Sequence, residues 1–466
     1  MSRINVLPDE VLIEMFDFYL NMGRPYDKTE IETWQSLVHV CRRWRSLVFR
    51  SPRRLNLRLF CNTETPTRDT LGIWPPLPLI IEGHLALVSG MDNIIAALGQ
   101  SNRICQVTLR DLTLQSSEEV LAEMQVPFPE LTDLQLSSYG GTPPIIPDSF
   151  LGGSAPRLRH FELSGTPFLG LSNLLLSATH LFWLRLVDIP HAGYISPEAM
   201  VALLSSLSNL KVLELGFRSP QSRPGWESPS LPPPKRSILP ALSYFNFTGV
   251  TEYLEELTTR IDTPQLNEMN ITFFNQIDFD CPRLAQFINR TPKLTAHDKA
   301  TVLFDDSAAS ITLRHQTSES ESGHLLIVIL CSEPDWQLSS IEQICSTLPP
   351  LSMVENLYID RAYWDLVWKN DAVENTLWFE FLLPFTAVKN LYLFRELVPG
   401  IALALQELVG GRIMEVLPSL QNIFAEGFEP SGPLQENIGP FVAARQLSGH
   451  PIAISVWAED PNMQSM

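Results

Sequence analysis

The sequence has few features of an exported or membrane-embedded protein. Its six cysteines include no Cys-x-x-Cys pair and are scattered, at Cys41, Cys61, Cys105, Cys281, Cys331 and Cys345. This is the pattern of reduced thiols rather than of a disulfide framework. Acidic residues, Asp9, Glu10 and Glu14, interrupt the first apolar run, so no secretory signal is expected. An apolar run such as Leu325–Leu330 is far shorter than the ~20 residues that span a bilayer. We therefore expect a protein of the cytoplasm, the nucleus or both, with no membrane partner.

Motifs of enzyme chemistry are missing as well. There is no G-x-S-x-G, Walker loop, H-E-x-x-H or G-x-G-x-x-G sequence. No two of the nine histidines stand four residues apart, the spacing that places two metal ligands on one helical face. We therefore expect no catalytic residue, no metal and no cofactor. An unrecognised hydrolase or transferase is the enzymatic alternative, and it would need a pocket with convergent titratable groups.

Charge is scarce and unevenly distributed. Charged residues make up 18% of the 466 residues, and the formal net charge is −19. Residues 1–60 contain 10 Lys or Arg and 7 Asp or Glu, net +3, whereas the remainder contains 23 and 45, net −22. A long acidic segment argues against a nucleic-acid partner, because phosphates require a basic face. Since 45% of the residues are hydrophobic, we expect a folded chain with a large core. The acidic segment suits a protein partner, and a basic partner would complement its charge.

Two amphipathic segments occupy the first sixty residues. The start, Leu7-Pro8-Asp9-Glu10, favours a helix, since proline is tolerated in the first turn and acids complement the helix dipole. Apolar residues then recur at helical spacing, at Leu7, Val11, Leu12, Met15, Phe16, Tyr19 and Leu20. A second periodic segment follows the polar stretch 21–33, with Trp34, Leu37, Val38, Cys41, Trp44, Leu47 and Val48. Two or three such helices bury little surface by themselves. Part of their apolar surface should therefore contact a partner or the next domain.

These two segments resemble the F-box. The matching residues are Leu7-Pro8-x-x-Val11-Leu12-x-x-x-Phe16 and Leu37-Val38-x-Val40-Cys41-Arg42-Arg43-Trp44, within residues 4–52, and 21–33 is longer than the usual loop between them. The resemblance implies a three-helix module that docks on the adaptor subunit of a cullin–RING ligase of the Skp–cullin–F-box type. Carried over by position, the first docking surface would contain Leu7, Pro8, Val11, Leu12 and Phe16. The second surface, or its support from inside, would contain Leu37, Val40, Cys41 and Trp44.

The remainder of the chain contains a degenerate sequence repeat of the form L-x-x-L-x-L. Seven units begin at Ile104, Leu131, Leu158, Leu181, Leu210, Leu242 and Leu266. The six spacings between Ile104 and Leu266 average 27 residues, within the ~20–29 typical of leucine-rich repeats. Sparser units start at Val354, Val388 and Leu420. The pattern predicts a short strand in each unit, with alternate side chains buried and a helix or irregular segment returning between strands. It resembles leucine-rich repeats only loosely, because the asparagine or cysteine after the strand is mostly missing.

The predicted fold class is therefore α+β and multidomain: a small three-helix F-box followed by an α/β solenoid with parallel strands. We divide the chain into a helical module (1–55), a linker with a first cap or repeat (56–102), a repeat array (103–275), an irregular region (276–350) and degenerate C-terminal repeats (351–466). A Pro/Ser-rich insertion, 219–237, interrupts the array. Whether 276–350 forms atypical repeats or a packed insertion is left open by the sequence.

A substrate-binding face follows from the strand alternation. The residues between the buried positions should line the concave side: Asp133, Gln135, His160, Glu162, Trp183, Arg185, Glu214, Tyr244, Asn246, Glu268 and Asn270, with Tyr358 and Tyr392 further along. Five of them are the binding residues we predict, because aromatic and charged side chains on a rigid face make good anchors: Trp183, Arg185, Tyr244, Tyr358 and Tyr392.

The predicted function is a non-catalytic receptor that holds an unknown protein substrate near the ligase. The alternative is a leucine-rich-repeat scaffold whose N-terminal helices only cap the array. The two hypotheses differ in whether residues 1–60 present apolar side chains to solvent.

Overall fold

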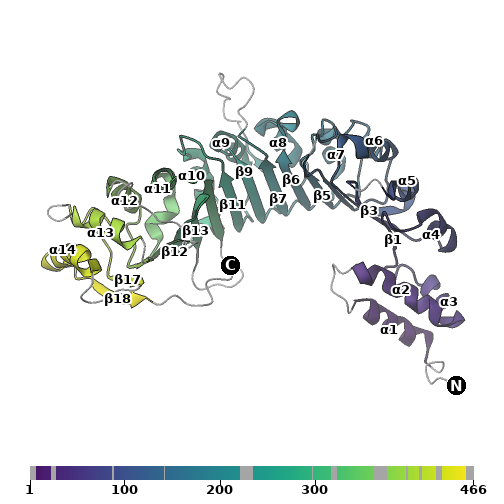
Figure 1. The fold of residues 1–466 in the computed structure, drawn as a ribbon, viewed down its shortest axis with the longest axis horizontal. Coiled ribbons are helices and arrows are strands. Elements are labelled where there is room, and N and C mark those ends of the chain that lie inside the picture. Colours follow the sequence, from purple (N-terminus) through teal and green to yellow (C-terminus); the bar gives the residue numbers. More distant parts are fainter. Residues whose placement is uncertain are drawn as a thin grey trace. The chain divides into compact units, whose positions relative to one another are not determined.

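The computed structural model describes residues 7–21, 28–86, 89–140, 142–220, 235–295, 297–315, 323–361, 375–394, 397–408, 412–426 and 433–457. It is an α+β fold of helices and largely parallel strands (Figure 1). The chain forms two compact units, 1–194 and 195–466. Most of the Pro/Ser-rich insertion lies outside the described residues.

Three short helices open the first unit: α1 (Asp9–Asn21), α2 (Lys28–Val40) and α3 (Arg42–Arg50). The acids Asp9 and Glu10 occupy the first turn of α1, where they complement the positive end of the helix dipole. The second periodic segment of the sequence is two helices rather than one. Cys41 is extended between them, and its sulfur accepts the Trp44 N–H at 3.5 Å, which caps α3.

The apolar interior of the three helices contains Leu12, Phe16, Trp34, Val38 and Val48, each at most 3% exposed. The interior continues into the following segment, because the indole N–H of Trp34 donates to the Arg58 carbonyl at 3.0 Å. Trp34 also packs edge-on against Trp74, with ring centroids 5.1 Å apart. Both contacts join the helices to the start of the sheet.

Six parallel strands pair in chain order in this unit: β1 (Leu59–Cys61), β2 (Leu79–His84), β3 (Ile104–Arg110), β4 (Asp133–Ser137), β5 (His160–Ser164) and β6 (Trp183–Ile189). Returning helices are α4 (Thr67–Ile73), α5 (Met91–Leu98), α6 (Leu114–Glu123) and α7 (Leu171–Ser177). The predicted strands begin with β3, and their aliphatic positions are buried as expected. Two strands, β1 and β2, lie in 56–102, where the sequence pattern predicted only a linker and a first unit.

The second unit contains a sheet in the order β7-β9-β11-β14-β13-β12-β15-β16-β17-β18. Its strands are β7 (Val212–Phe217), β9 (Tyr244–Gly249), β11 (Glu268–Phe273), β12 (Lys299–Phe304), β13 (Ala308–Arg314), β14 (His324–Leu330), β15 (Asn356–Arg361), β16 (Asn390–Leu393), β17 (Asn422–Glu426) and β18 (Ala453–Trp457). A separate pair joins β8 (Ser237–Ile238) to β10 (Ile261–Asp262). Its helices are α8 (Pro197–Leu204), α9 (Thr251–Arg260), α10 (Pro282–Asn289), α11 (Pro334–Thr347), α12 (Asn375–Leu382), α13 (Val398–Gln406) and α14 (Pro433–Leu447).

The strands are mostly parallel as predicted, and one strand of the region that the sequence left open departs from this pattern. Strand β13 runs antiparallel to both β12 and β14, within the region 276–350 that the repeat pattern left unexplained. The cause is a connection too short for a crossover. Asp305 closes the turn after β12, since its carboxylate accepts the N–H groups of Ser307 and Ala308, each at 2.7 Å. The region is therefore a three-stranded insert within the sheet, between β11 and β15.

In each unit the helices lie along one side of the strands (Figure 1), and the buried alternate residues point toward them. The other side, here called the open face, carries the half-buried and exposed residues of the same strands. Exposed and half-buried side chains of neighbouring strands therefore form rows across the open face.

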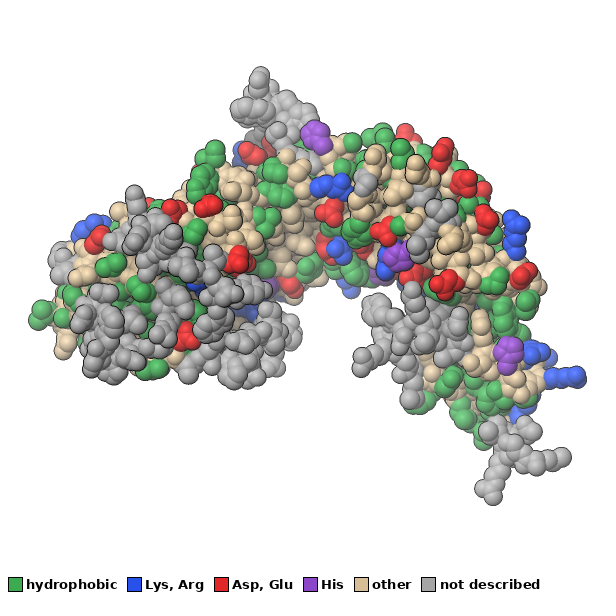
Figure 2. Space-filling model, in the orientation of Figure 1, with side chains coloured by type: hydrophobic (Ala, Val, Ile, Leu, Met, Phe, Trp, Pro, Cys, Tyr) green, Lys and Arg blue, Asp and Glu red, His purple; other side chains and the backbone are tan. Residues whose placement is uncertain are grey.

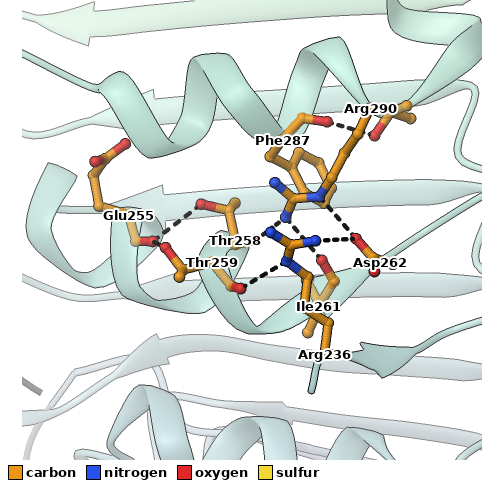
Figure 3. A network of polar contacts seen from close by, with 9 residues as sticks. Arg236, Glu255, Thr258, Thr259, Ile261, Asp262, Phe287 and Arg290 are labelled. Carbon is orange, nitrogen blue, oxygen red and sulfur yellow. Dashed lines mark hydrogen bonds and ion pairs between the residues drawn. The ribbon is translucent and has the colours of Figure 1, made fainter. Parts of the chain in front are cut away.

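A polar cluster on the helix side holds α9 and α10 together (Figure 3). Arg290, at the end of α10, donates to the Asp262 carboxylate at 2.7 Å and to the Ile261 carbonyl at 3.0 Å. It also donates to the Thr258 carbonyl. These carbonyls lie at the C-terminal end of α9, where a helix leaves acceptors without intrahelical partners. Arg236 adds a longer ion pair to Asp262, at 3.9 Å.

Because Arg290 satisfies these acceptors and is only 22% exposed, Arg290→Met should lower the free energy of unfolding by about 2 kcal/mol. Arg236→Met is the matched control. Its guanidinium is 44% exposed, and it adds one bond to the Thr259 carbonyl at 3.2 Å to the ion pair, so we expect a loss below about 1 kcal/mol. Urea unfolding of both variants measures the difference. Equal stability of the two variants would show that the Arg290 contacts contribute nothing beyond a surface ion pair.

Candidate functional site

One face of α1 presents apolar side chains to solvent. Val11, Met15, Phe18 and Tyr19 are 42%, 48%, 67% and 49% exposed. Their spacing places them on one side of the helix, and we call them the α1 apolar stripe. Val40, at the end of α2, is also 59% exposed. Figure 2 shows hydrophobic and basic side chains over these three helices.

The predicted docking residues divide into two groups. Pro8, Val11, Val40 and Cys41 are exposed, and Leu7 is half-buried. The others are placed differently. Leu12 and Phe16 are buried in the interior, and so is Leu37. Trp44 is half-buried against Phe16, with ring centroids 4.7 Å apart.

The structure thus places Leu12 and Phe16 beneath the surface that the sequence pattern assigned to them. Residues 12 and 16 lie on the side of α1 that faces the interior, whereas the α1 apolar stripe lies on another side of the same helix. The prediction missed Met15, Phe18 and Tyr19 as surface residues. The sequence did contain a signal for these surface residues: this helix has more apolar residues than one core-facing stripe requires.

Arg43 positions the beginning of this surface. Its guanidinium donates to the Leu7 carbonyl at 2.5 Å and forms an ion pair with Asp9 at 2.6 Å. These contacts fasten the Leu7-Pro8 turn to α3, and with it the orientation of α1. Because they involve a backbone carbonyl as well as a carboxylate, they restrict the turn more than an isolated surface pair would.

The open face of the first unit carries polar rows. His160 Nδ1 lies 2.5 Å from the Asp133 carboxylate, and Gln135 donates to Glu162 at 2.5 Å. Trp183 is 38% exposed on β6. Arg185, two residues further along the strand, is half-buried and lies 3.8 Å from Glu162. Both predicted binding residues therefore lie on the open face as expected.

In the second unit, aromatic side chains stack across three strands. Tyr358 and Tyr392 have ring centroids 4.1 Å apart with planes at 2°, and Tyr392 and Phe424 follow at 4.6 Å and 10°. We call these three residues the aromatic ladder. Trp457, on β18, meets the tyrosines edge-on, at 6.2 Å from Tyr358 and 5.8 Å from Tyr392. Tyr244 lies apart on β9, and its hydroxyl accepts from the Asn270 amide at 3.2 Å.

A row of asparagines runs beside the aromatic ladder. Asn422 donates to Asn390 and Asn390 donates to Asn356, each at 2.8 Å. The same row continues on β12 with Lys299, the register partner of Asn356. The Lys299 ammonium lies 4.1 Å from the Tyr358 ring centroid. This is a short cation–π contact.

Burial has consequences for the protonation of this cluster. Desolvation raises the pKa of Tyr358, and the neighbouring Tyr392 raises it further, so the hydroxyl stays protonated at physiological pH. Desolvation and the nearby Arg314 lower the pKa of Lys299. The sequence prediction included both tyrosines but missed Lys299 and Trp457, because β12 and β18 carry no recognisable repeat. It also missed Phe424 on β17, although a sparse unit starts at Leu420.

No known family model and no curated protein matches this sequence. The residues themselves therefore carry the functional argument.

In the described part of the chain, no group of three or more His, Cys, Asp or Glu side chains is placed to hold a metal ion. Across the same residues, no helix combines the length and the apolar character needed to cross a bilayer. Burial raises the pKa of the Cys281 and Cys345 thiols, which keeps them protonated and poor nucleophiles. The two surfaces that stand out, the α1 apolar stripe and the open face around the aromatic ladder, have the composition of protein-binding surfaces.

Proposed function

We propose that this protein is a non-catalytic substrate receptor of a Skp–cullin–F-box ubiquitin ligase and acts inside the cell. The N-terminal helices bind the adaptor subunit, and the open face of a leucine-rich-repeat-like solenoid binds a protein substrate. The observation that carries the proposal is the α1 apolar stripe, which lies within the segment that resembles the F-box.

The stripe is difficult to explain by stability alone. Phe18 and Met15 could be polar without loss to the interior, because their side chains are 67% and 48% exposed while Leu12 and Phe16 fill the core. Four large apolar residues on a 13-residue helix form a contiguous patch, and such patches typically mark an interaction site. Burying apolar surface contributes about 25 cal/mol per Å², so a partner that covers the stripe gains substantially.

The alternative is a repeat scaffold whose helices only cap the sheet. The packing of Trp34 on Trp74 and its bond to Arg58 are what a cap requires, and they favour this reading for α2. A cap, however, needs a polar outer surface. The α1 apolar stripe is the opposite, so the receptor hypothesis accounts for α1 better.

The proposal predicts that Met15→Glu/Phe18→Glu weakens binding to purified adaptor subunit about 100-fold or more, as expected when two central apolar contacts are lost. Both side chains are exposed, so the variant should fold normally, which circular dichroism checks. Ile73→Glu is the matched control, because Ile73 is 73% exposed in the same unit but lies on α4. Its affinity should stay within about twofold of wild type.

Titration calorimetry with the isolated adaptor measures all three proteins. If the folded wild type does not bind, the F-box hypothesis fails and the scaffold remains. If the double variant binds as tightly as wild type, the α1 apolar stripe is not the docking surface.

A further inference from the structure

Three basic side chains lie side by side on the open face of the three-stranded insert. Arg314 on β13 is the register partner of Lys299 on β12. The neighbouring pair Leu313 and Leu325 places Arg314 beside His324 on β14. The antiparallel strand therefore produces a basic row that a regular parallel repeat would not create. It lies in the part of the chain outside residues 1–60 that carries a net charge of −22.

Lys299 forms no ion pair with a carboxylate of the described residues, although the charge of Asp298 acts on it from farther away. Its ammonium lies over the Tyr358 ring, and no carboxylate of a described residue is within ion-pair distance. Three carboxylates around the row each lie near a different side chain. Glu268 is 3.8 Å from His324, Asp298 is 3.9 Å from His315, and Glu355 is 2.7 Å from Lys389. A half-buried cation without an ion pair is a position where an external anion is favoured.

The aromatic ladder begins immediately beside this cation. Lys299, Tyr358, Tyr392 and Phe424 occupy the consecutive strands β12, β15, β16 and β17. The Lys299 ammonium, the two tyrosine rings and the Phe424 ring follow one another at 4.1, 4.1 and 4.6 Å, so the distance from the cation to the far end of the ladder is at most about 13 Å. An extended peptide covers that distance in about four residues, at ~3.3 Å each.

We propose that this part of the open face binds an extended peptide segment of a partner protein, with an anionic side chain on Lys299 and an apolar side chain about four residues away against Phe424. Tyr358 and Tyr392, with Trp457 edge-on to both, line the surface between the two. The anion is a carboxylate or a phosphate, since both complement the Lys299 ammonium. This inference rests on the proposed function and names its substrate class as acidic, whereas the overall charge of the chain points to a basic partner.

The test is selection from a displayed library of random nine-residue peptides on the full-length protein without any adaptor. Wild type should enrich Asp or Glu about four residues from a large apolar residue. Lys299→Met keeps the aliphatic stem over Tyr358 but removes the charge, so it should enrich the apolar residue without the acid. Lys389→Met is the control, because Lys389 is already paired with Glu355, and it should select like wild type.

The best enriched peptide is then synthesised with Glu, Gln or phosphoserine at the acidic position. Binding measured by fluorescence anisotropy should weaken about five- to tenfold with Gln, and it should be equally weak for all three peptides on Lys299→Met. Tighter binding of phosphoserine than of Glu on wild type would assign a phosphate ligand, and the reverse a carboxylate.

The inference is overturned if wild type enriches no acidic residue, or if Lys299→Met enriches it equally. Because the adaptor is absent from this assay, that failure is distinct from a failure of wild type to bind the adaptor.

Discussion

Replacing Arg445 with alanine should lower the free energy of unfolding by about 4 kcal/mol. Arg445 lies on α14 and is completely buried. Its guanidinium donates to the carbonyls of Leu417, Pro418 and Leu420 at 3.3, 3.1 and 3.4 Å, and to that of Ile413 at 3.3 Å. One cation thus satisfies four carbonyls in the segment that leads into β17.

No carboxylate of a described residue neutralises this buried charge, and desolvation lowers the pKa of Arg445. Carbonyl dipoles are its main compensation, together with the Met414 sulfur at 3.0 Å. Truncation to alanine removes all of these bonds and leaves a cavity, so two costs add. Arg445→Met fills most of the volume but leaves the carbonyls without donors, so we expect about half the loss.

Urea unfolding of the two variants and of Arg412→Ala measures these differences. Arg412 is the matched control, because its side chain is 61% exposed beside Glu415 and over the Phe379 ring, and its loss should cost less than about 1 kcal/mol. A change below about 1 kcal/mol for Arg445→Ala would show that solvent or a shifted loop replaces the guanidinium. Since β17 carries Phe424, the alanine variant should also disturb one end of the aromatic ladder.

Acidification should destabilise the second unit through His297 by about 3 kcal/mol between pH 7 and pH 4. His297 is 2% exposed, and burial lowers its pKa from 6.5 to about 4. Its Nε2 lies 3.2 Å from the Gly323 carbonyl. The neighbours His324 and His315 lower the pKa further, whereas that hydrogen bond and Asp298 raise it.

The sign follows from proton uptake. In the unfolded chain His297 binds a proton as the pH falls through 6.5, whereas the folded chain resists protonation until about pH 4. The unfolded state therefore binds more protons within this window, and stability is lost as the pH falls. Above pH 6.5 both states are neutral, and the contribution is complete.

The measurement is the pH dependence of urea unfolding for wild type, His297→Gln and His450→Gln. Carboxylates add their own acid destabilisation to all three proteins, so the difference between curves isolates one histidine. His297→Gln should lose about 3 kcal/mol less than wild type between pH 7 and pH 4. His450→Gln, which replaces an exposed histidine of the same unit, should follow wild type. Parallel curves for all three would show that His297 is protonated in the folded state.

Much of the strand pattern was predictable from the sequence because it depends on local periodicity. Alternate aliphatic residues such as Leu134 and Leu136 must face a core, and they are buried as expected. Tyr358 and Tyr392 could be placed on one face for the same reason, since they occupy equivalent positions in neighbouring strands. Apolar spacing predicted two helical segments at the N-terminus, and the break at Cys41 that makes the second one two helices has no strong sequence signal.

Local periodicity does not determine which apolar residues are exposed or which residues of different strands contact one another. Leu12 and Val11 are both apolar on one helix, and only packing against α2 and α3 makes one interior and the other exposed. Lys299 has no distinctive sequence context. It became a candidate anion site because the short Asp305 turn makes β13 antiparallel, which places Arg314 beside Lys299, while β15 places Tyr358 under its ammonium. The sequence by itself determined which residues alternate between core and surface, since that depends on spacing along one segment. Which surface residues meet was decided by the tertiary structure alone, because strand order and register join segments that are far apart in the chain.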